Sequence, residues 1–322
     1  MIVTAMKLQR PSPVCLCPFL LPAFCAAVFS ITGCQASTAP VAHSAGRLVA
    51  WGDDRHGQVS ELPQGDTFVD IAAGATFSVA LDRNGRIHVW GDDTHGQITD
   101  VPEGRFEAVA AGAAHIVAIA SNGELHAWGN DDFGQVSEAP KGRFDVVDAG
   151  TLFAIAIDEE GTLRAWGSDG ANQISDVPNG AFKTVAAGTG HVLAIDDEGK
   201  LHGWGRDMFG QVSAAPAHEF RTVVAGDEHS AGLAQDGTLH VWGGSGDEQG
   251  LIRDAPDDEH SVLATGADHL LAIDAAGKLH VWGDDSHGQV TKAPNEGTYL
   301  AVAGGALHAL TIKRCNEAVC DY

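Results

Sequence analysis

The sequence predicts an all-β protein, a seven-bladed β-propeller with about three antiparallel strands in each blade. All seven tryptophans stand in a Trp-Gly dipeptide and recur every 38 to 40 residues, and a fixed period of this length is typical of repeat proteins. Between successive tryptophans lie three apolar runs of five or six residues, rich in Val, Ile and Ala and bounded by Gly, which indicates strands. The tryptophans are Trp51, Trp90, Trp128, Trp166, Trp204, Trp242 and Trp282.

The repeat divides the 322-residue chain into one folded domain and short flanking segments. Lys7 and Arg10 precede an apolar run from Val14 to Ile31, which is typical of a signal peptide over residues 1–33. The run ends in Ile-Thr-Gly-Cys34, which resembles a bacterial lipobox, so we expect cleavage before Cys34 and lipidation of its thiol. An ordinary secretory signal, or a start at Met6, is the alternative. Residues 34–45 then form a flexible tether, residues 46–314 the propeller and residues 315–322 a C-terminal tail.

These segments predict an exported protein that is lipid-anchored to the bacterial cell envelope, at the outer membrane or the cell surface. Loss of Lys7 and Arg10 with the signal takes the formal charge from −24 to −26. Such a surface repels nucleic acid and anionic lipid, so membrane contact through the lipid anchor alone and a basic or neutral partner are expected. Solubility alone is the other explanation of the charge.

Three of the six cysteines leave with the signal, and Cys34, Cys315 and Cys320 remain. In an exported compartment the close pair Cys315 and Cys320 predicts a local disulfide. Two free thiols at a frayed terminus are the alternative.

The second copy of the repeat shows the expected elements in order: strands over 68–74, 77–81 and 87–91, the last two joined at Asn84-Gly85. Small residues in the first strand place it nearest the axis, and the Trp strand lies furthest out with its indole between blades. A fourth strand around Gly134–Ser137 would be short at best. The chain begins with a third strand and ends with a first and a second, so its ends complete one shared blade.

The unit Ala111-Gly112-Ala113-Ala114-His115, followed by Asn122-Gly123, Trp128-Gly129 and Gly134-Gln135, resembles the regulator of chromosome condensation repeat. The short period and the seven-fold count are most similar to the propeller-type bacterial β-lactamase inhibitor proteins. The resemblance implies a propeller fold over residues 46–314. It also implies a structural role for the corner histidine of each repeat.

Strand direction places the Gly-x-x-His corners and the loops after Trp-Gly on one face, and the Asn-Gly hairpins on the other. We call the first the corner face. Its corners could line the mouth of a channel, where their five histidines could bind a metal ion. A packing role explains these histidines better, so we expect no metal or other cofactor. The corner side chains are also candidate partner contacts; they are Phe77, His115, Phe153, His191, His229, His269 and His308.

Aromatic or imidazole side chains at the tips of the loops after Trp-Gly are the best candidates for partner contacts, with ordinary loop packing as the alternative. The paired aspartates of these loops favour turns over a calcium site, because the other oxygen ligands of a calcium loop are missing. The candidates are His56, His95, Phe133, Phe209 and His287. A second histidine set two residues before Trp, at positions 88, 126, 202, 240 and 280, is expected to pack or hydrogen-bond between blades.

No catalytic motif appears, so the sequence predicts a non-enzymatic, monomeric lipoprotein that binds a protein or peptide through its corner face. The alternative, suggested by the resemblance, is inhibition of β-lactamase or of a penicillin-binding enzyme. Aromatic anchors, which those inhibitors carry two positions after the corner glycine, are missing here. The positions hold Thr76, Ala114, Leu152, Gly190, Glu228, Asp268 and Leu307.

Overall fold

The computed structural model describes residues 45–65, 67–244 and 250–315, and in these ranges it contains strands and turns but no helix. The all-β class predicted from the sequence is confirmed. The strands are β1 (Gly46–Gly52), β2 (Phe68–Ala73), β3 (Phe77–Asp82), β4 (Ile87–Gly91), β5 (Phe106–Ala111), β6 (His115–Ala120), β7 (Leu125–Gly129), β8 (Phe144–Ala149), β9 (Phe153–Asp158), β10 (Leu163–Gly167), β11 (Phe182–Ala187), β12 (His191–Asp196), β13 (Leu201–Gly205), β14 (Phe220–Ala225), β15 (His229–Ala234), β16 (Leu239–Gly243), β17 (His260–Thr265), β18 (His269–Asp274), β19 (Leu279–Gly283), β20 (Tyr299–Gly304) and β21 (His308–Arg314).

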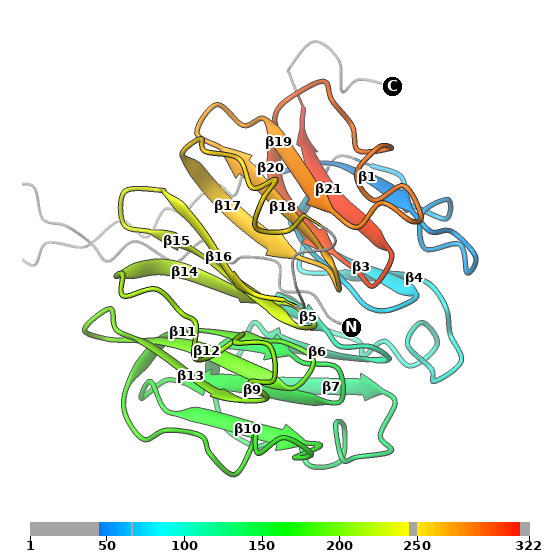
Figure 1. Ribbon diagram of the computed structural model, residues 1–322. Coiled ribbons are helices and arrows are strands. Elements are labelled where there is room, and N and C mark those ends of the chain that lie inside the picture. Colours follow the sequence, from blue (N-terminus) through cyan, green and yellow to red (C-terminus); the bar gives the residue numbers. More distant parts are fainter. Residues whose placement is uncertain (1–44, 66, 245–249, 316–322) are drawn as a thin grey trace, which may run out of the picture.

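Consecutive strands pair antiparallel in units of three, from β2-β3-β4 to β17-β18-β19. The remaining unit, β20-β21-β1, joins the two ends of the chain: β1 pairs with β21 from Gly46 opposite Arg314 to Gly52 opposite His308. A single pairing of Gly46 with Phe68 connects this unit to β2-β3-β4, so the two form one six-stranded sheet. Figure 1 shows the result, with β1 (blue) beside β21 (red) and the units following one another around the molecule.

The first strands of the units lie innermost and contact one another in sequence, from β2 to β20 and back to β2. Small side chains such as Ala72 and Ala110, both buried, allow this close approach. Backbone hydrogen bonds between neighbouring corners reinforce it: Ala75 N to Ala113 O, Ala113 N to Thr151 O, Thr189 N to Gly226 O, Asp227 N to Ala267 O, Ala267 N to Gly305 O and Ala306 N to Gly74 O, at 3.1–3.4 Å.

The hydrophobic core lies between neighbouring units. One cluster joins Phe77 and Val79 of β3 to Phe106 of β5 and Trp128 of β7, and each of the other units has a similar cluster. Each indole also donates a hydrogen bond across the same boundary, from Trp128 Nε1 to the carbonyl of Gln97 at 3.0 Å, for example. The expected position of the tryptophans between blades is therefore confirmed.

The segment after each Trp strand forms turns, so no fourth strand is present around Gly134–Ser137. A glutamine in this segment supplies the carbonyl that the next indole binds in all units but one. Six of the seven acceptors are Gln58, Gln97, Gln135, Gln173, Gln211 and Gln289, and the seventh is Leu251.

Candidate protein-binding face

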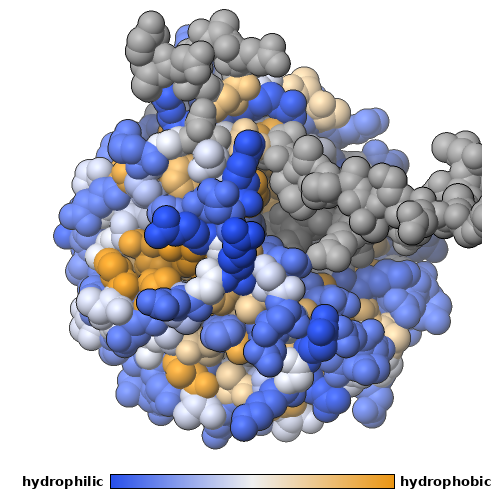
Figure 2. All heavy atoms as spheres, turned by 180° about the vertical axis from the view of Figure 1, so that it is seen from behind, coloured by the Kyte–Doolittle hydropathy of each residue, from blue (hydrophilic) through white to orange (hydrophobic). Residues whose placement is uncertain are grey.

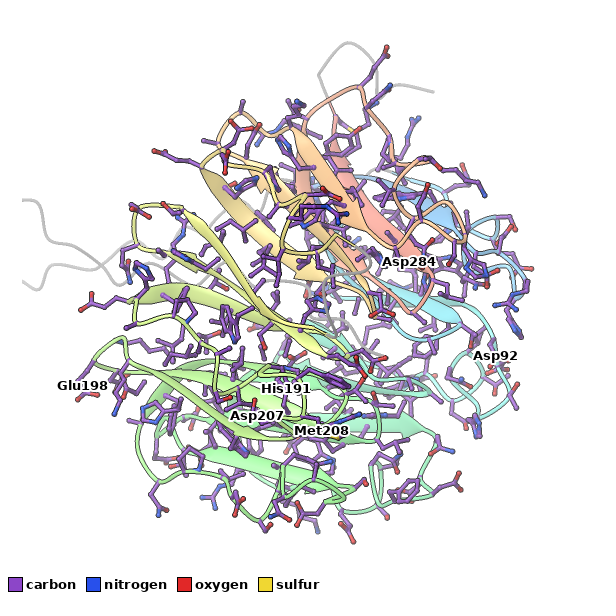
Figure 3. All side chains as sticks on the ribbon, viewed as in Figure 1. Asp92, His191, Glu198, Asp207, Met208 and Asp284 are labelled. Carbon is purple, nitrogen blue, oxygen red and sulfur yellow. The ribbon has the colours of Figure 1, made fainter. Side chains whose placement is uncertain are left out.

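The corners and the loops after the Trp strands emerge at the same end of the strands, as the sequence predicts. Gly91, which ends β4, lies opposite Phe77, which begins β3, and Asp92 N donates to Thr76 O at 3.0 Å. The hairpins occupy the opposite end. Figure 3 shows this separation, with the loop residue Asp92 at the right and the hairpin residue Glu198 at the left.

The loops of the corner face are fixed by one aspartate and one glutamine. Asp131 accepts backbone hydrogen bonds from Val136 and Ser137 at 2.8 and 2.9 Å. The fully buried Gln135 side chain accepts from Phe133 N at 2.8 Å and donates to Asn130 Oδ1 at 3.1 Å. The same aspartate and glutamine recur in most copies, so these loops are rigid platforms that present the residue before the glycine.

The loop aspartates serve the turn, which was the interpretation favoured over calcium. The amide of Ser137, together with that of Val136, holds the pKa of Asp131 below its ordinary value, against a small opposing effect of burial. Within the described ranges, no group of three or more His, Cys, Asp or Glu side chains is arranged to hold a metal ion.

The loop tips differ in exposure. Phe133 is 51% exposed, and His56 and His95 are also exposed, while Phe209 and His287 are half-buried. Arg206 stacks over the Phe209 ring at 5.9 Å, and Ser286 Oγ lies 2.9 Å from His287 Nδ1. All five candidates therefore lie on the corner face, and three of them project into solvent.

Two exposed apolar residues were missed by the sequence analysis. Met208 is 73% exposed in the loop after β13, and Ile252 is 44% exposed in the loop after β16. Met208 directly precedes the candidate Phe209, and this position in the same loop could have identified it as a further contact candidate. Figure 3 shows Met208 beside Asp207 near the centre of the view.

The seven corner side chains are all buried, with exposures of 0 or 1%. Each ring packs on the corner glycine that precedes it: a Cβ on Gly112 would lie 2.1 Å from His115 Cε1, and one on Gly150 would lie 2.0 Å from Phe153 Cε1. Glycine at the corner is thus required by the ring above it. In this structure the corner residues are not accessible to a partner, which favours the packing role.

Three corner histidines also link neighbouring units. His308 Nε2 lies 2.9 Å from Ser78 Oγ, His191 Nε2 lies 3.0 Å from Ser230 Oγ, and His229 Nε2 lies 2.7 Å from Thr265 Oγ1. Burial lowers the pKa of His115, His229 and His308 to about 4 and that of His191 and His269 to about 3. These rings are therefore neutral at physiological pH.

The second histidine set makes most of its contacts within a blade, where the sequence analysis expected packing or hydrogen bonding between blades. His88 of β4 contacts the edge of Phe68 in β2 of the same unit, with 5.4 Å between ring centroids, and its Nε2 lies 3.3 Å from Asp82 Oδ2. His202 and His280 repeat the aspartate contact at 2.7 and 3.1 Å. The physical reason is that the aspartate ending the second strand faces the histidine across the hairpin.

Acidic side chains gather on the corner face near the axis. Burial, followed by the charges of Asp227, Asp284 and Glu228, raises the pKa of Asp268 to about 6. Arg206 Nη2 approaches Glu228 Oε1 to 3.9 Å. The mouth of the propeller on this face is therefore strongly negative.

The terminal sites are only partly covered by the structure. Cys34 and Cys320 lie outside the described residues, and Cys315 is disulfide-bonded. Of the residues that are described, none belongs to a helix able to cross a membrane.

Comparison with known proteins identifies the repeat. The regulator of chromosome condensation (RCC1) repeat model matches residues 68–97, 106–135, 182–211, 220–249 and 262–289. No curated relative matches the sequence.

Several solved structures share the fold. Prp20p from Saccharomyces cerevisiae, described with its binding to Gsp1p and histones, is 18% identical, with 86% of this chain and 93% of that chain covered and a TM-score of 0.72. Yeast RCC1 (Prp20) bound to Kap60 is 16% identical, with 92% and 98% covered and a TM-score of 0.72. Human WBSCR16 is 19% identical, with 83% and 98% covered and a TM-score of 0.69. At these identities the likeness concerns the fold: this chain is a β-propeller, and five of its repeats are regulator of chromosome condensation repeats.

Proposed function

We propose that this protein is a non-enzymatic binding scaffold that holds a protein or peptide partner on the loops of its corner face. The observation that carries the proposal is the distribution of exposed apolar side chains. Among the residues that the structure describes, the exposed large hydrophobic side chains are Phe133, Met208 and Ile252, and all three lie on loops that follow a Trp strand. Because all three share one face and none lies on a described hairpin, they point to the corner face as the contact surface.

The loops suit this role because their backbone is fixed before any partner arrives. The aspartate and glutamine contacts hold each tip in one conformation, so binding would cost little loop ordering. Exposed aromatic and methionine side chains are also the types enriched in protein interfaces. His56 and His95 would add polar contacts from neighbouring loops.

The partner's surface would be basic or neutral. The chain carries a formal charge of −24, and Asp227, Glu228, Asp268 and Asp284 add negative charge close to the axis. Figure 2 shows hydrophilic residues over most of one side of the molecule, with hydrophobic residues in separate small patches. The similar yeast propeller is described as binding proteins, which agrees with a protein partner, whereas nucleic acid would be repelled.

Cross-linking tests this proposal. A photoreactive group introduced through Met208→Cys should capture a partner in intact cell envelopes, because this side chain points into solvent on the corner face. The matched control is Glu160→Cys, on an exposed hairpin of the opposite face. Capture at Met208 that is lost in the Phe133→Asp variant supports the proposal. Equal capture from Glu160, or capture insensitive to Phe133→Asp, would refute it.

We also propose that the protein acts as a monomeric, exported lipoprotein anchored through Cys34. The signal-like segment and the lipobox support this placement. The first described strand supports its geometry, because Gly46 pairs with Arg314 beside the start of β2, at the hairpin end. A lipid on Cys34 would then leave the corner face directed away from the membrane. We expect the wild-type protein to incorporate labelled palmitate and the Cys34→Ala variant not to incorporate it. A wild-type protein without labelled palmitate would contradict the proposal.

A further inference from the structure

A cavity of about 540 Å³ lies at the outer edge of the β11-β12-β13 unit, away from the corner-face loops. Its accessible apolar lining includes Leu201, Val212 and Pro216, and the buried Leu193 lies beneath them. β13 is the outermost strand of its unit, so the cavity opens to solvent at the rim of the propeller. Its size falls within the range of cavities that bind small molecules or single peptide side chains.

One residue that lines the cavity departs from the repeat. The position before Trp in the outer strand is Gly203 here, whereas the other six copies carry Ala50, Val89, Ala127, Ala165, Val241 and Val281. A Cβ at position 203 would lie 2.9 Å from Val212 Cγ1 and 3.2 Å from Leu193 Cδ2. The glycine therefore lets Val212 and Leu193 pack directly against the backbone of β13, and a side chain at position 203 would displace them.

A second departure lies on the rim of the same cavity. His218 stands where four other copies have a glycine with positive φ, namely Gly65, Gly104, Gly142 and Gly180. Its ring stacks on His240 of β16 at 4.2 Å between centroids, so it leans toward the next unit and leaves the apolar lining open. Two residues that line this cavity thus depart from the repeat, and the cavity is larger than the equivalent hollow of about 330 Å³ beside β4, where Val89 lines the wall.

The rim carries more negative than positive charge. Glu198 and Glu219 flank the opening together with Lys200, and all three are exposed. No ion pair joins any of these three side chains to another described residue. A ligand that combines an apolar body with an adjacent positive charge fits this arrangement.

We propose that this cavity is a second docking site, which takes a partner peptide by one aliphatic side chain that is next to a lysine or arginine. The aliphatic group packs on Leu201 and Val212, and the basic group lies against Glu198 and Glu219. The site is separate from the corner face: Figure 3 shows Glu198 at the left edge of the molecule and Met208 nearer its centre. The protein would then engage its surroundings at two places.

Titration with defined peptides tests the site. The probe is acetyl-Gly-Ser-Leu-Lys-Ser-Gly-amide, added to the folded chain while backbone amide resonances are followed. We expect saturable shifts at Gly203 and Val212, and about fivefold weaker binding when the lysine of the peptide is replaced by glutamate. Absence of shifts at these amides, or equal binding of the two peptides, would overturn the proposal.

Variants drawn from the repeat itself supply the controls. Gly203→Val introduces the residue that three other copies carry and should weaken binding of the lysine peptide more than about tenfold, because it displaces Val212 from the lining. Ala127→Val, at the same position of another unit, should leave binding unchanged. Glu198→Lys should reverse the preference between the two peptides, while Glu160→Lys should not. Wild-type binding by folded Gly203→Val would also overturn the proposal.

Discussion

At the scale of single residues, the corner rings explain both the glycines and the histidines of the motif. A ring that occupies the place of a glycine Cβ must itself be buried, and burial keeps an imidazole neutral. Phenylalanine fills the same position in two copies, as Phe77 and Phe153, which shows that shape matters more than charge there. This substitution within the sequence was the signal that the corner residues are packing elements.

Acidification should destabilise the propeller through these histidines. Their folded pKa values of about 3 to 4 lie below the ordinary value of 6.5, so the unfolded chain binds more protons between pH 6.5 and about 4. The free energy of unfolding should therefore fall as the pH is lowered through this window, by about 1–2 kcal/mol for each histidine at pH 5. Denaturant unfolding at several pH values measures it.

The matched variant is His115→Phe, which copies the native residue of two other corners. It should fold and show a smaller loss of stability between pH 6.5 and 5 than the wild type. An identical pH dependence in wild type and variant would contradict the assignment.

Asp268 should act in the opposite direction. Its folded pKa of about 6 lies above the ordinary 3.8, so the folded chain binds more protons between these values and stability is lost as the pH rises through them. Asp268→Asn should therefore raise the free energy of unfolding at pH 7, by about 1–2 kcal/mol after allowance for solvent screening. The gain should vanish at pH 3.5. A destabilised variant at pH 7 would show that the acidic cluster is compensated by contacts other than those described.

At the scale of elements, the indole of each outer strand and the turn of the preceding unit that supplies its carbonyl acceptor act as one joint. Trp128 packs between units and donates to the carbonyl of Gln97, whose side chain also fixes the amide of His95. The strand and the loop therefore depend on each other. This joint also positions the loops from which the corner face is built.

Removing the indole N–H should weaken this joint without changing its shape. Replacement of Trp128 by benzothienylalanine keeps the ring but removes the donor, and should lower the free energy of unfolding by about 1–2 kcal/mol, because the buried Gln97 carbonyl loses its partner. Thermal or denaturant unfolding measures the change. Stability equal to that of the wild type would mean that packing alone holds the blades together.

The elements were largely predictable, whereas their side-chain partners were not. Strand lengths, hairpins and the order of strands follow from the apolar runs and the Asn-Gly turns; β1 begins at Gly46 and β21 ends at Arg314. The side-chain contacts of His88 could not be predicted from the sequence, because a histidine two residues before Trp could face either its own blade or the next. Asp82, six residues earlier, was the available signal for an intra-blade contact.

At the scale of the whole molecule, pairing of β1 with β21 joins the ends of the chain and places both beside the hairpins. The corner face lies at the opposite end of these two strands. Which loop tips project from that face could be predicted only in part, because exposure depends on neighbouring units: Phe209 lies under Arg206, and Met208 takes the outward position. The cavity beside Gly203 could not be predicted from the sequence, because its walls come from residues 193–203 and 212–219, which only the fold brings together.

The central claim is that the corner-face loops hold the partner, and hydrogen–deuterium exchange of the chain with and without the captured partner tests it most directly. Partner binding should slow exchange in the loops over residues 92–97, 130–135 and 206–211, which contain the rigid tips. The hairpins over residues 83–86, 121–124 and 159–162 should exchange as in the free protein. Protection confined to the hairpins, with the three loops unchanged, would contradict the account.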